Sequence, residues 1–292
     1  MKKFILIILT AAVFTPACNN EDVFAPWRDP SKYVIPSDET YFTVVQYNIW
    51  GAKKGRTSEH FDNIAAVLNS QKPDLVTLNE VDSMTPRNKF VMFKELANRT
   101  GMYSAFAPAR EKGDEGWYSS DAAYGDAILS KYPIEEVRRF KLYPDPAQGD
   151  TEKENRAVCA ARVKIGERSV WIASTHLDHR SNDLSRISQA NQLKDIVESL
   201  DGTLVLGGDL NAVPGSESIN IISTYLTPQY PMVSPEYYTA PSKVNGQQNP
   251  TKLIDYILIK KSESAIRCMS YRIVNSTASD HCAVVATFKF TE

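Results

Sequence analysis

The segment TLVLGGDLNAVP places an acid and an amide directly after a short apolar run. The run has the length of a buried strand, and Gly207 and Gly208 are expected to let the backbone turn sharply at its end. Because alternate side chains of a strand share a face, Asp209 and Asn211 are expected to point the same way. A carboxylate and an amide held side by side at the mouth of a sheet would suit a site that binds a metal ion and a phosphate.

Five further segments have the same form, an apolar strand that stops at polar residues of ligand type. Chemistry often lies on loops that rigid strands position. Oxygen ligands such as Glu80 and Asp280 suit a hard cation, Mg²⁺ or Mn²⁺, and not zinc. His176 and His281 each lie beside an acid, and an acid that orients a histidine sets its tautomer and raises its basicity. The five segments are residues 44–48, 75–80, 171–178, 253–255 and 279–281.

The elements that must position these residues are many short strands and few helices, with no repeat and no linker-like break after residue 40. Hairpin spacing favours an α/β fold with mixed, mostly antiparallel sheets, packed face to face with helices outside. Strands are expected at 41–50, 75–79, 103–107, 123–130, 137–143, 156–165, 169–175, 204–206, 253–259, 266–274 and 282–290. Helices are expected at 59–69, 90–99, 184–200 and 216–225, and long surface loops at 108–120 and 226–251.

An ordered set of motifs resembles the endonuclease/exonuclease/phosphatase superfamily, which includes deoxyribonuclease I, inositol polyphosphate 5-phosphatases and bacterial sphingomyelinases. The motifs are QYNIW, LNEVD, YGDAILSKYPI, STHLDH, GGDLNAVP, IDYIL and SDHCAV, over about residues 41–290. GGDLN followed by SDH is fairly specific in this order, although each motif alone would be weak. The resemblance implies a four-layer α-β-β-α sandwich and metal-assisted hydrolysis of a phosphodiester or phosphomonoester.

The resemblance implies a metal-binding side of the site. Glu80 of LNEVD would be the principal ligand of Mg²⁺ or Mn²⁺, with Asn48 of QYNIW beside it. Asp280 of SDH would also face the metal, and Asp209 of GGDLN would orient and deprotonate the attacking water. Water is a poor nucleophile at neutral pH, so the chemistry itself calls for such a carboxylate base.

The resemblance also implies a phosphate-binding side. His281 would bind and polarise the phosphoryl group, with Asp255 of IDYIL as its carboxylate partner. Asn211 would hold a phosphate oxygen, and His176 would contact a phosphate oxygen or assist the leaving group. Hydrolysis develops charge on the phosphoryl and leaving oxygens, so donors and cations must stand there beforehand.

Supporting residues leave alternatives open. Asp126 stands where many relatives have asparagine, and it is expected either to pair with His176 or to be a hydrogen-bonded loop acid. Arg156 could reach phosphate or form a salt bridge at a strand edge. The remaining supporting residues are Asp178 and His179, with Arg186 and Gln189 expected to brace the His179 loop more than to act in catalysis. Four aromatic residues could shape a substrate groove or anchor loops: Trp117, Tyr124, Tyr237 and Tyr238.

The N-terminus has the pattern of an export signal over residues 1–17, with a basic start, an apolar run and a small residue before Cys18. Cys18 is expected to carry a lipid; an ordinary cleavage near Ala17 and an uncleaved anchor are the alternatives. Residues 18–40 are polar and read as a tether, and residues 41–292 as a single domain. The protein is therefore expected outside the cytoplasm, attached to a bacterial membrane on its periplasmic or outer surface.

The net charge and the cysteine content limit the kind of substrate and the kind of cysteine site that the chain can have. Loss of Lys2 and Lys3 with the signal would change the formal net charge from −2 to −4, which disfavours a grip on long nucleic acid. Besides Cys18 there are three cysteines and no C-x-x-C spacing, so buried thiols are expected. One bridge between Cys268 and Cys282 is the alternative in an oxidising compartment.

The sequence therefore favours an exported, metal-dependent phosphoesterase that acts as a monomer on a phosphoester substrate. A nuclease, a sphingomyelinase or phospholipase C-like enzyme, and a sugar or inositol phosphatase would share the same site residues. A non-catalytic surface protein that binds a phosphorylated ligand is a more remote alternative, because such a protein would have lost part of the site.

Overall fold

The computed structural model describes residues 40–291, except positions 52, 54, 115, 116, 119, 147–153, 181 and 242–249. The expected export signal, the lipid-bearing Cys18 and the tether up to residue 39 lie outside the described residues. Among the described helices, none has both the length and the apolar character needed to cross a membrane.

The strands and helices follow the expected order, and most ends fall within a few residues of those expected. The strands of the first sheet are β1 (Tyr41–Asn48), β2 (Leu75–Ser83), β3 (Tyr103–Arg110), β4 (Ala123–Ser130), β11 (Ile266–Val274) and β12 (Ala283–Phe290). Those of the second are β5 (Ile134–Leu142), β6 (Arg156–Ile165), β7 (Arg168–His176), β8 (Thr203–Asp209), β9 (Leu226–Pro228) and β10 (Asp255–Lys260). The helices are α2 (Ser58–Gln71), α3 (Met92–Thr100), α4 (Leu184–Ser199), α5 (Glu217–Ile222) and the 3₁₀ helix η3 (Pro235–Tyr237).

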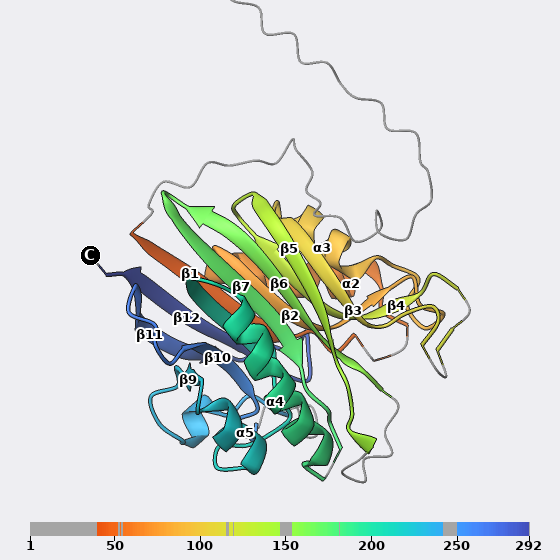
Figure 1. The fold of residues 1–292 in the computed structure, drawn as a ribbon. Coiled ribbons are helices and arrows are strands. Elements are labelled where there is room, and N and C mark those ends of the chain that lie inside the picture. The colour runs from red at the N-terminus through yellow and green to blue at the C-terminus, as the bar shows by residue number, and fades with distance from the viewer. Residues whose placement is uncertain are drawn as a thin grey trace, which may run out of the picture.

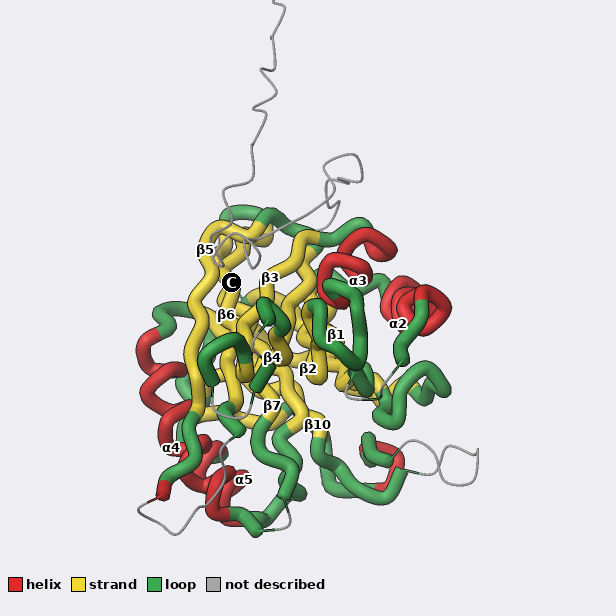
Figure 2. The backbone as a smooth tube through the Cα atoms, turned by 90° about the vertical axis from the view of Figure 1, so that its right-hand side faces the viewer, coloured by secondary structure: helices red, strands yellow, loops and turns green. Residues whose placement is uncertain are grey.

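The described strands form two mixed sheets, with the orders β11-β12-β1-β2-β4-β3 and β5-β6-β7-β8-β10-β9. Each described sheet contains one parallel pair, β1–β2 or β7–β8, and its other pairs are antiparallel. The sheets pack face to face, and Figure 1 and Figure 2 show α2 and α3 covering one and α4 and α5 the other. The expected four-layer α-β-β-α sandwich is therefore confirmed.

Three apolar clusters separate these four layers. The cluster between the sheets, which we call the apolar interface, is built on fully buried residues such as Phe42, Ile128, Val205 and Phe288. The second cluster packs α2 and α3 on the first sheet, and the third packs α4 and α5 on the second. Because burying each large apolar side chain contributes about 1.5–3 kcal/mol, these layers hold the strand ends in fixed positions.

The structure corrects the role expected for the paired glycines. Gly207 and Gly208 do not form a turn but lie inside β8, between strands β7 and β10. A Cβ atom on Gly207 would lie 2.1 Å from Thr77 Oγ1, and one on Gly208 would lie 2.3 Å from the carbonyl oxygen of Thr175. Glycine is required here because a side chain of the opposite sheet and the backbone of the neighbouring β7 lie too close for any Cβ atom.

Other differences concern loops and cysteines. The strand expected to end at residue 79 continues to Ser83, and the loop expected over 226–251 contains β9 and η3. The three cysteines of the described residues are free thiols. Cys268 Sγ donates to the carbonyl of Ser270 and Cys282 Sγ to Asn275 Oδ1, so the alternative of a bridge between the two cysteines is wrong.

Candidate active site

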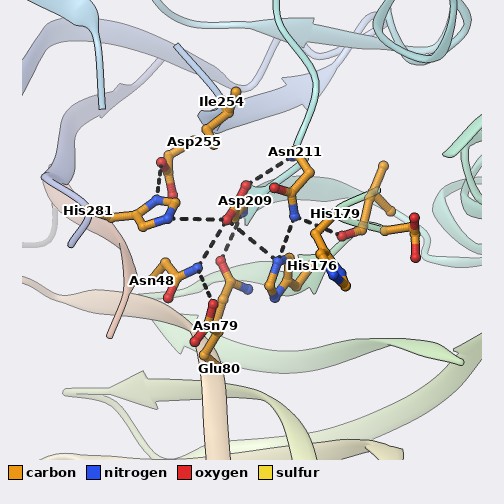
Figure 3. A network of polar contacts seen from close by, with 12 residues as sticks. Asn48, Asn79, Glu80, His176, His179, Asp209, Asn211, Ile254, Asp255 and His281 are labelled. Atoms are coloured by element: carbon orange, nitrogen blue, oxygen red, sulfur yellow. Dashed lines mark hydrogen bonds and ion pairs between the residues drawn. The ribbon is translucent and has the colours of Figure 1, made fainter. Parts of the chain in front are cut away.

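Asp209, the last residue of β8, lies at the centre of a polar network at one rim of the two sheets (Figure 3). Its side chain is buried and accepts hydrogen bonds from Asn48 Nδ2 at 3.0 Å and from the backbone N–H of Asn211 at 2.9 Å. His176 Nε2 lies 3.5 Å and His281 Nε2 lies 3.7 Å from Asp209 Oδ2. One carboxylate therefore contacts residues from both sheets.

The environment of Asp209 favours the protonated carboxyl more than water does. Burial raises its pKa, the Asp255 carboxylate raises it further, and His281 and the hydrogen bonds from Asn211 and Asn48 offset part of the rise. The resulting pKa is about 7. A carboxylate with a pKa near the operating pH is well suited to accept a proton from water.

Asn211 reaches the site through a turn and not through the strand face expected for it. Its backbone has a φ of 49°, in the left-handed region that asparagine tolerates better than most residues. The turn lets its side chain donate to the carbonyl of Leu177 at 3.0 Å and places Nδ2 2.8 Å from His176 Nε2. Asp209 and Asn211 therefore lie in the same site as expected, but the turn between them, and not a shared strand face, brings them together.

Glu80 owes its position to a bulge in β2. Leu78 pairs with Ala127 and Val81 with Gly125, so two residues of β2 stand opposite one residue of β4. The backbone of Glu80 has a φ of 60°, which is strained for a glutamate, and such residues are concentrated at functional sites. In a regular strand Asn79 and Glu80 would point to opposite faces, whereas here Asn48 Nδ2 donates to Glu80 Oε1 at 3.2 Å.

Gly51 secures this bulge from the loop after β1. A Cβ atom at Gly51 would lie 1.7 Å from the carbonyl oxygen of Glu80. The backbone N–H of Ile49 also donates to the carbonyl of Asn79 at 3.2 Å. The loop after β1 therefore lies directly against the bulge, and only glycine fits at the point of contact.

His281 and Asp255 form a tight pair. His281 Nδ1 lies 2.8 Å from Asp255 Oδ2, and Asp255 is fully buried at the start of β10. Burial lowers the pKa of His281, but the carboxylates of Asp255 and Asp209 outweigh it and raise the pKa to about 10. At neutral pH His281 is therefore an imidazolium that can donate a hydrogen bond to a phosphoryl oxygen.

His176 has the opposite protonation preference. Burial and the nearby positive charges of Arg156 and His281 lower its pKa well below the usual value, so its imidazole is neutral. Its Nδ1 is buried and has no hydrogen-bond partner. The alternative of an Asp126–His176 pair is therefore wrong, because Asp126 instead accepts a 2.7 Å hydrogen bond from Asn79 on the neighbouring strand.

Arg186 and Gln189, in the first turns of α4, brace the β7–α4 loop. Arg186 donates to the carbonyls of Asp178 and Arg180 at 2.8 and 2.6 Å, and Gln189 Oε1 accepts from the N–H of Asp178 at 3.0 Å. Asp178 Oδ1 accepts from Arg180 Nε at 2.9 Å. These contacts fix the loop on which His179 stands.

The sequence reasoning missed a layer of buried polar residues beneath Asp209, which we call the polar strip: Gln46, Thr77, Asn79 and Ser174. Asn79 Oδ1 accepts from the N–H of Asp209 at 2.9 Å and from Gln46 Nε2 at 2.6 Å. Asn79 Nδ2 donates to Asp126 and to the carbonyl of Thr175 at 2.9 Å. The signal that could have found this layer is polar residues at alternate positions of apolar strands, 46 and 48 on β1 and 77 and 79 on β2.

Two groups of residues have donor atoms suited to a metal ion. In the described part of the chain, Asp209, Asp255 and His281 have ligand atoms within 4.8 Å of one another. An imidazolium has no lone pair to offer a metal, so we interpret this group as a proton-sharing cluster. The residues expected to bind the metal lie beside it: Asn48 bridges Glu80 to Asp209, and Asp280 precedes His281 in the chain.

The electrostatics of Glu80 and Asp280 fit a cation. Burial raises the pKa of Asp280, His281 lowers it, and the Glu80 carboxylate raises it, so the two acids share one electrostatic environment. Both also act to raise the pKa of Arg56, although burial of that guanidinium lowers it overall. Carboxylate and amide oxygens are the donor set that Mg²⁺ and Mn²⁺ prefer.

A cleft of about 340 Å³ opens over this network. Glu80, His176, Asp209, Asn211 and His281 line it, together with Arg87, Arg110, Trp117, Tyr124, Glu154, Arg156 and His179. Trp117 and Tyr124 therefore face the cleft. Tyr237 and Tyr238 instead pack on the α4–α5 side of the second sheet.

A two-sheet sandwich that gathers carboxylates, amides and histidines at one rim defines a metal-dependent phosphoester hydrolase. The chain belongs to the Endonuclease/Exonuclease/phosphatase family, whose family model matches residues 45–281. No curated protein matches the chain.

Solved structures share the fold at low sequence identity. The endonuclease/exonuclease/phosphatase from Beutenbergia cavernae is 21% identical, with a TM-score of 0.65 over 86% of this chain and 72% of that one. The human Nocturnin catalytic domain with bound sulfate anion is 22% identical, with a TM-score of 0.62 over 86% and 95%. The mannosyl-6-phosphatase of Bacteroides thetaiotaomicron is 17% identical, with a TM-score of 0.63 over 85% and 100%.

Proposed function

We propose that the protein hydrolyses a small phosphoester with Mg²⁺ or Mn²⁺, by attack of a water molecule that Asp209 deprotonates. The observation that carries this proposal is the position of Asp209, whose buried carboxylate contacts Asn48 from the first sheet and lies beside both His176 and His281. Its pKa of about 7 supports a role as general base.

The two histidines would act differently because their protonation states differ. His281, an imidazolium held by Asp255, would donate to a phosphoryl oxygen and stabilise charge that develops there. His176 is neutral, which favours contact with a phosphate oxygen over proton donation to the leaving group. Asn211 Nδ2 contacts His176 Nε2, which fixes the imidazole, and Asn211 would also contact a phosphate oxygen.

Glu80, Asn48 and Asp280 would hold the metal ion. When bound, a divalent ion supplies positive charge that stabilises the phosphoryl oxygens and lowers the pKa of water. The bulge at Glu80 and its contact with Gly51 would then serve to keep this carboxylate beside Asn48.

Two arguments support a small substrate over long nucleic acid. The formal net charge of the whole chain is −2, whereas proteins that grip nucleic acid usually present a basic surface. One structural neighbour is described as a mannosyl-6-phosphatase and another was solved with a sulfate anion. A nuclease and a sphingomyelinase or phospholipase C-like enzyme remain the alternatives, and turnover of DNA, sphingomyelin and sugar phosphates under one metal condition would discriminate among them.

The direct test is hydrolysis of p-nitrophenyl phosphate and bis-p-nitrophenyl phosphate with Mg²⁺ or Mn²⁺, with and without chelator. We expect chelator to abolish turnover and Asp209→Asn to lower kcat at least about 100-fold, the usual contribution of a general base. Turnover that resists chelation, or full activity of Asp209→Asn and His281→Ala, would contradict the proposal. Ligand binding without any turnover would favour the non-catalytic alternative.

We also propose that the protein is exported and anchored by a lipid on Cys18. The support is the basic start, the apolar run and the small residue before Cys18 in the sequence. Growth of an expressing bacterium with labelled palmitate should label the wild type and not Cys18→Ser. Recovery of unlabelled wild-type protein in the cytosolic fraction would contradict this placement.

A further inference from the structure

The cleft has a basic wall on the side of Asp209 away from His281, where His176 and His179 lie (Figure 3). Arg156, the first residue of β6, forms part of this wall and is only 2% exposed. Its Nη2 lies 3.0 Å from His179 Nδ1, which fixes the guanidinium in the cleft. Its positive charge also lowers the pKa of His176, so it stands close to the reaction centre.

One buried N–H group of Arg156 has no hydrogen-bond acceptor. Its Nε is buried without a hydrogen-bond partner. The nearest carboxylate oxygens, on Glu154 and Asp178, lie 3.5 and 3.9 Å from Nη2, beyond the usual length of a charge-assisted hydrogen bond, about 2.7–2.9 Å. Asp178 is engaged by Arg180 at 2.9 Å. A buried guanidinium with an unused N–H group costs free energy, which an anionic ligand would offset.

Arg110 extends the wall outward. Its guanidinium carbon lies over the Trp117 ring, 4.8 Å from the centroid, and Trp117 Nε1 donates to the carbonyl of Ala122 at 2.9 Å. The Glu154 carboxylate lies between Arg110 and Arg156, at 3.7 and 3.5 Å. This part of the cleft therefore already stabilises one anionic group of the protein.

We infer that the wall formed by Arg156, Arg110 and Trp117 is a second anion-binding subsite, and that the substrate is a small phosphoester with a second anionic group near its leaving oxygen. The inference rests on the proposed function, because His281 and the metal-binding residues already serve the reacting phosphoryl group. The cleft volume of about 340 Å³ suits a molecule of the size of a sugar bisphosphate.

The test compares glucose 1,6-bisphosphate with glucose 6-phosphate as substrates. Wild type should prefer the bisphosphate by at least about tenfold in kcat/KM, the effect of one hydrogen bond to a charged group. Arg110→Gln and Arg156→Lys should each lower this ratio about tenfold. Glutamine removes the positive charge, and lysine keeps the charge but cannot donate two parallel hydrogen bonds as the planar guanidinium does. Glu154→Gln should raise the ratio. Arg138→Gln, the same charge change on β5 outside the cleft, should leave it unaltered.

Binding in the presence of chelator separates this inference from the proposed function. By calorimetry the bisphosphate should bind at least about tenfold more tightly than the monophosphate, and Arg156→Lys should reduce that difference. If this pattern holds but no phosphoester is hydrolysed, the proposed function fails and the subsite stands. Equal binding and equal kcat/KM for the two sugars, or a preference for single-stranded oligonucleotides over the bisphosphate, would overturn the inference. Thermal melting of each variant would verify that it is folded.

Discussion

The two sheets meet through two regions of opposite character. The apolar interface contains side chains such as Phe42, Ile128 and Phe288, which pack without direction. The polar strip joins the same sheets through two hydrogen bonds of Asn79, each 2.9 Å long, with the carbonyl of Thr175 and the N–H of Asp209. The apolar interface tolerates small shifts, whereas the polar strip fixes individual atoms. Asp209 stands on the polar strip, so the placement of the proposed general base depends on the more demanding region.

The largest effect should follow loss of the polar strip at its centre. Asn79→Ala would leave the buried N–H of Asp209 without its side-chain acceptor and leave Gln46 Nε2 with only Asp255 Oδ1, at 3.5 Å. We expect the free energy of unfolding to fall by about 2–4 kcal/mol and kcat to fall about 100-fold. Urea denaturation and p-nitrophenyl phosphate hydrolysis measure the two effects. An active, equally stable variant would show that the polar strip does not position Asp209.

A smaller effect should follow displacement of the bulge that joins the polar strip to the residues proposed to bind the metal. In Gly51→Ala the new Cβ would have to displace the carbonyl of Glu80. We expect the Mg²⁺ or Mn²⁺ concentration for half-maximal activity to rise about tenfold, because one misplaced ligand costs roughly 1.4 kcal/mol or more.

Gly202→Ala is the control for this variant, because Gly202 also lies next to a strand end but its added Cβ meets no neighbour. Its φ of 72° means that the substitution should cost about 1 kcal/mol of stability without changing the metal dependence. An unaltered metal dependence in Gly51→Ala would contradict the proposed coupling between Gly51 and Glu80.

Asp126 should make the polar strip sensitive to pH. Burial raises its pKa, the hydrogen bond from Asn79 and the charge of Arg156 lower it, and Asp209 and Glu80 raise it, so the pKa is about 7 where an ordinary aspartate has 3.8. The folded state therefore binds more protons than the unfolded state between about pH 4 and 7, and stability falls as pH rises through this window. Asp126→Asn should make the loss between pH 5 and 8 smaller by roughly 1–3 kcal/mol. Urea denaturation at both pH values in chelator measures it, and parallel pH profiles of the two proteins would count against a raised pKa.

The smallest effect should come from the apolar interface. Ile128 is fully buried between the sheets, and Ile128→Val removes one methylene group. We expect a loss of about 1 kcal/mol in unfolding free energy and a kcat within about twofold of wild type. A large loss of activity here would mean that the apolar interface positions the site as strictly as the polar strip does.

The sequence predicted the sandwich well because its signals are local and periodic. The strand patterns gave β4, β6 and β11 with their observed ends, and Gly101 ends α3 in the left-handed conformation that glycine favours. The ordered motifs indicated which strand ends carry the site. These features depend on alternation, spacing and turn residues, which can be read without knowledge of the neighbouring strands.

The features that could not be predicted depend on neighbours. Glu80 takes a left-handed backbone that its residue type disfavours, so only the opposing strand and Gly51 explain the bulge. Gly207 and Gly208 looked like a turn because the atoms that exclude a Cβ, the Thr77 side chain and the Thr175 carbonyl, lie on other strands. The sequence offered His176 as a possible partner of Asp126. In the structure, Asn79 from the adjacent strand donates a hydrogen bond to Asp126 instead.

The contacts of Asn79 also bear on the order of events during folding. This residue joins β2 to the backbone of β7 and β8, which come from the other sheet and from more than 90 positions further along the chain. Neither sheet alone can position the Asp209 carboxylate, because loop closure over such a separation must come first. Enzyme activity should consequently return only in the last kinetic phase of refolding, after far-ultraviolet circular dichroism has recovered its native signal.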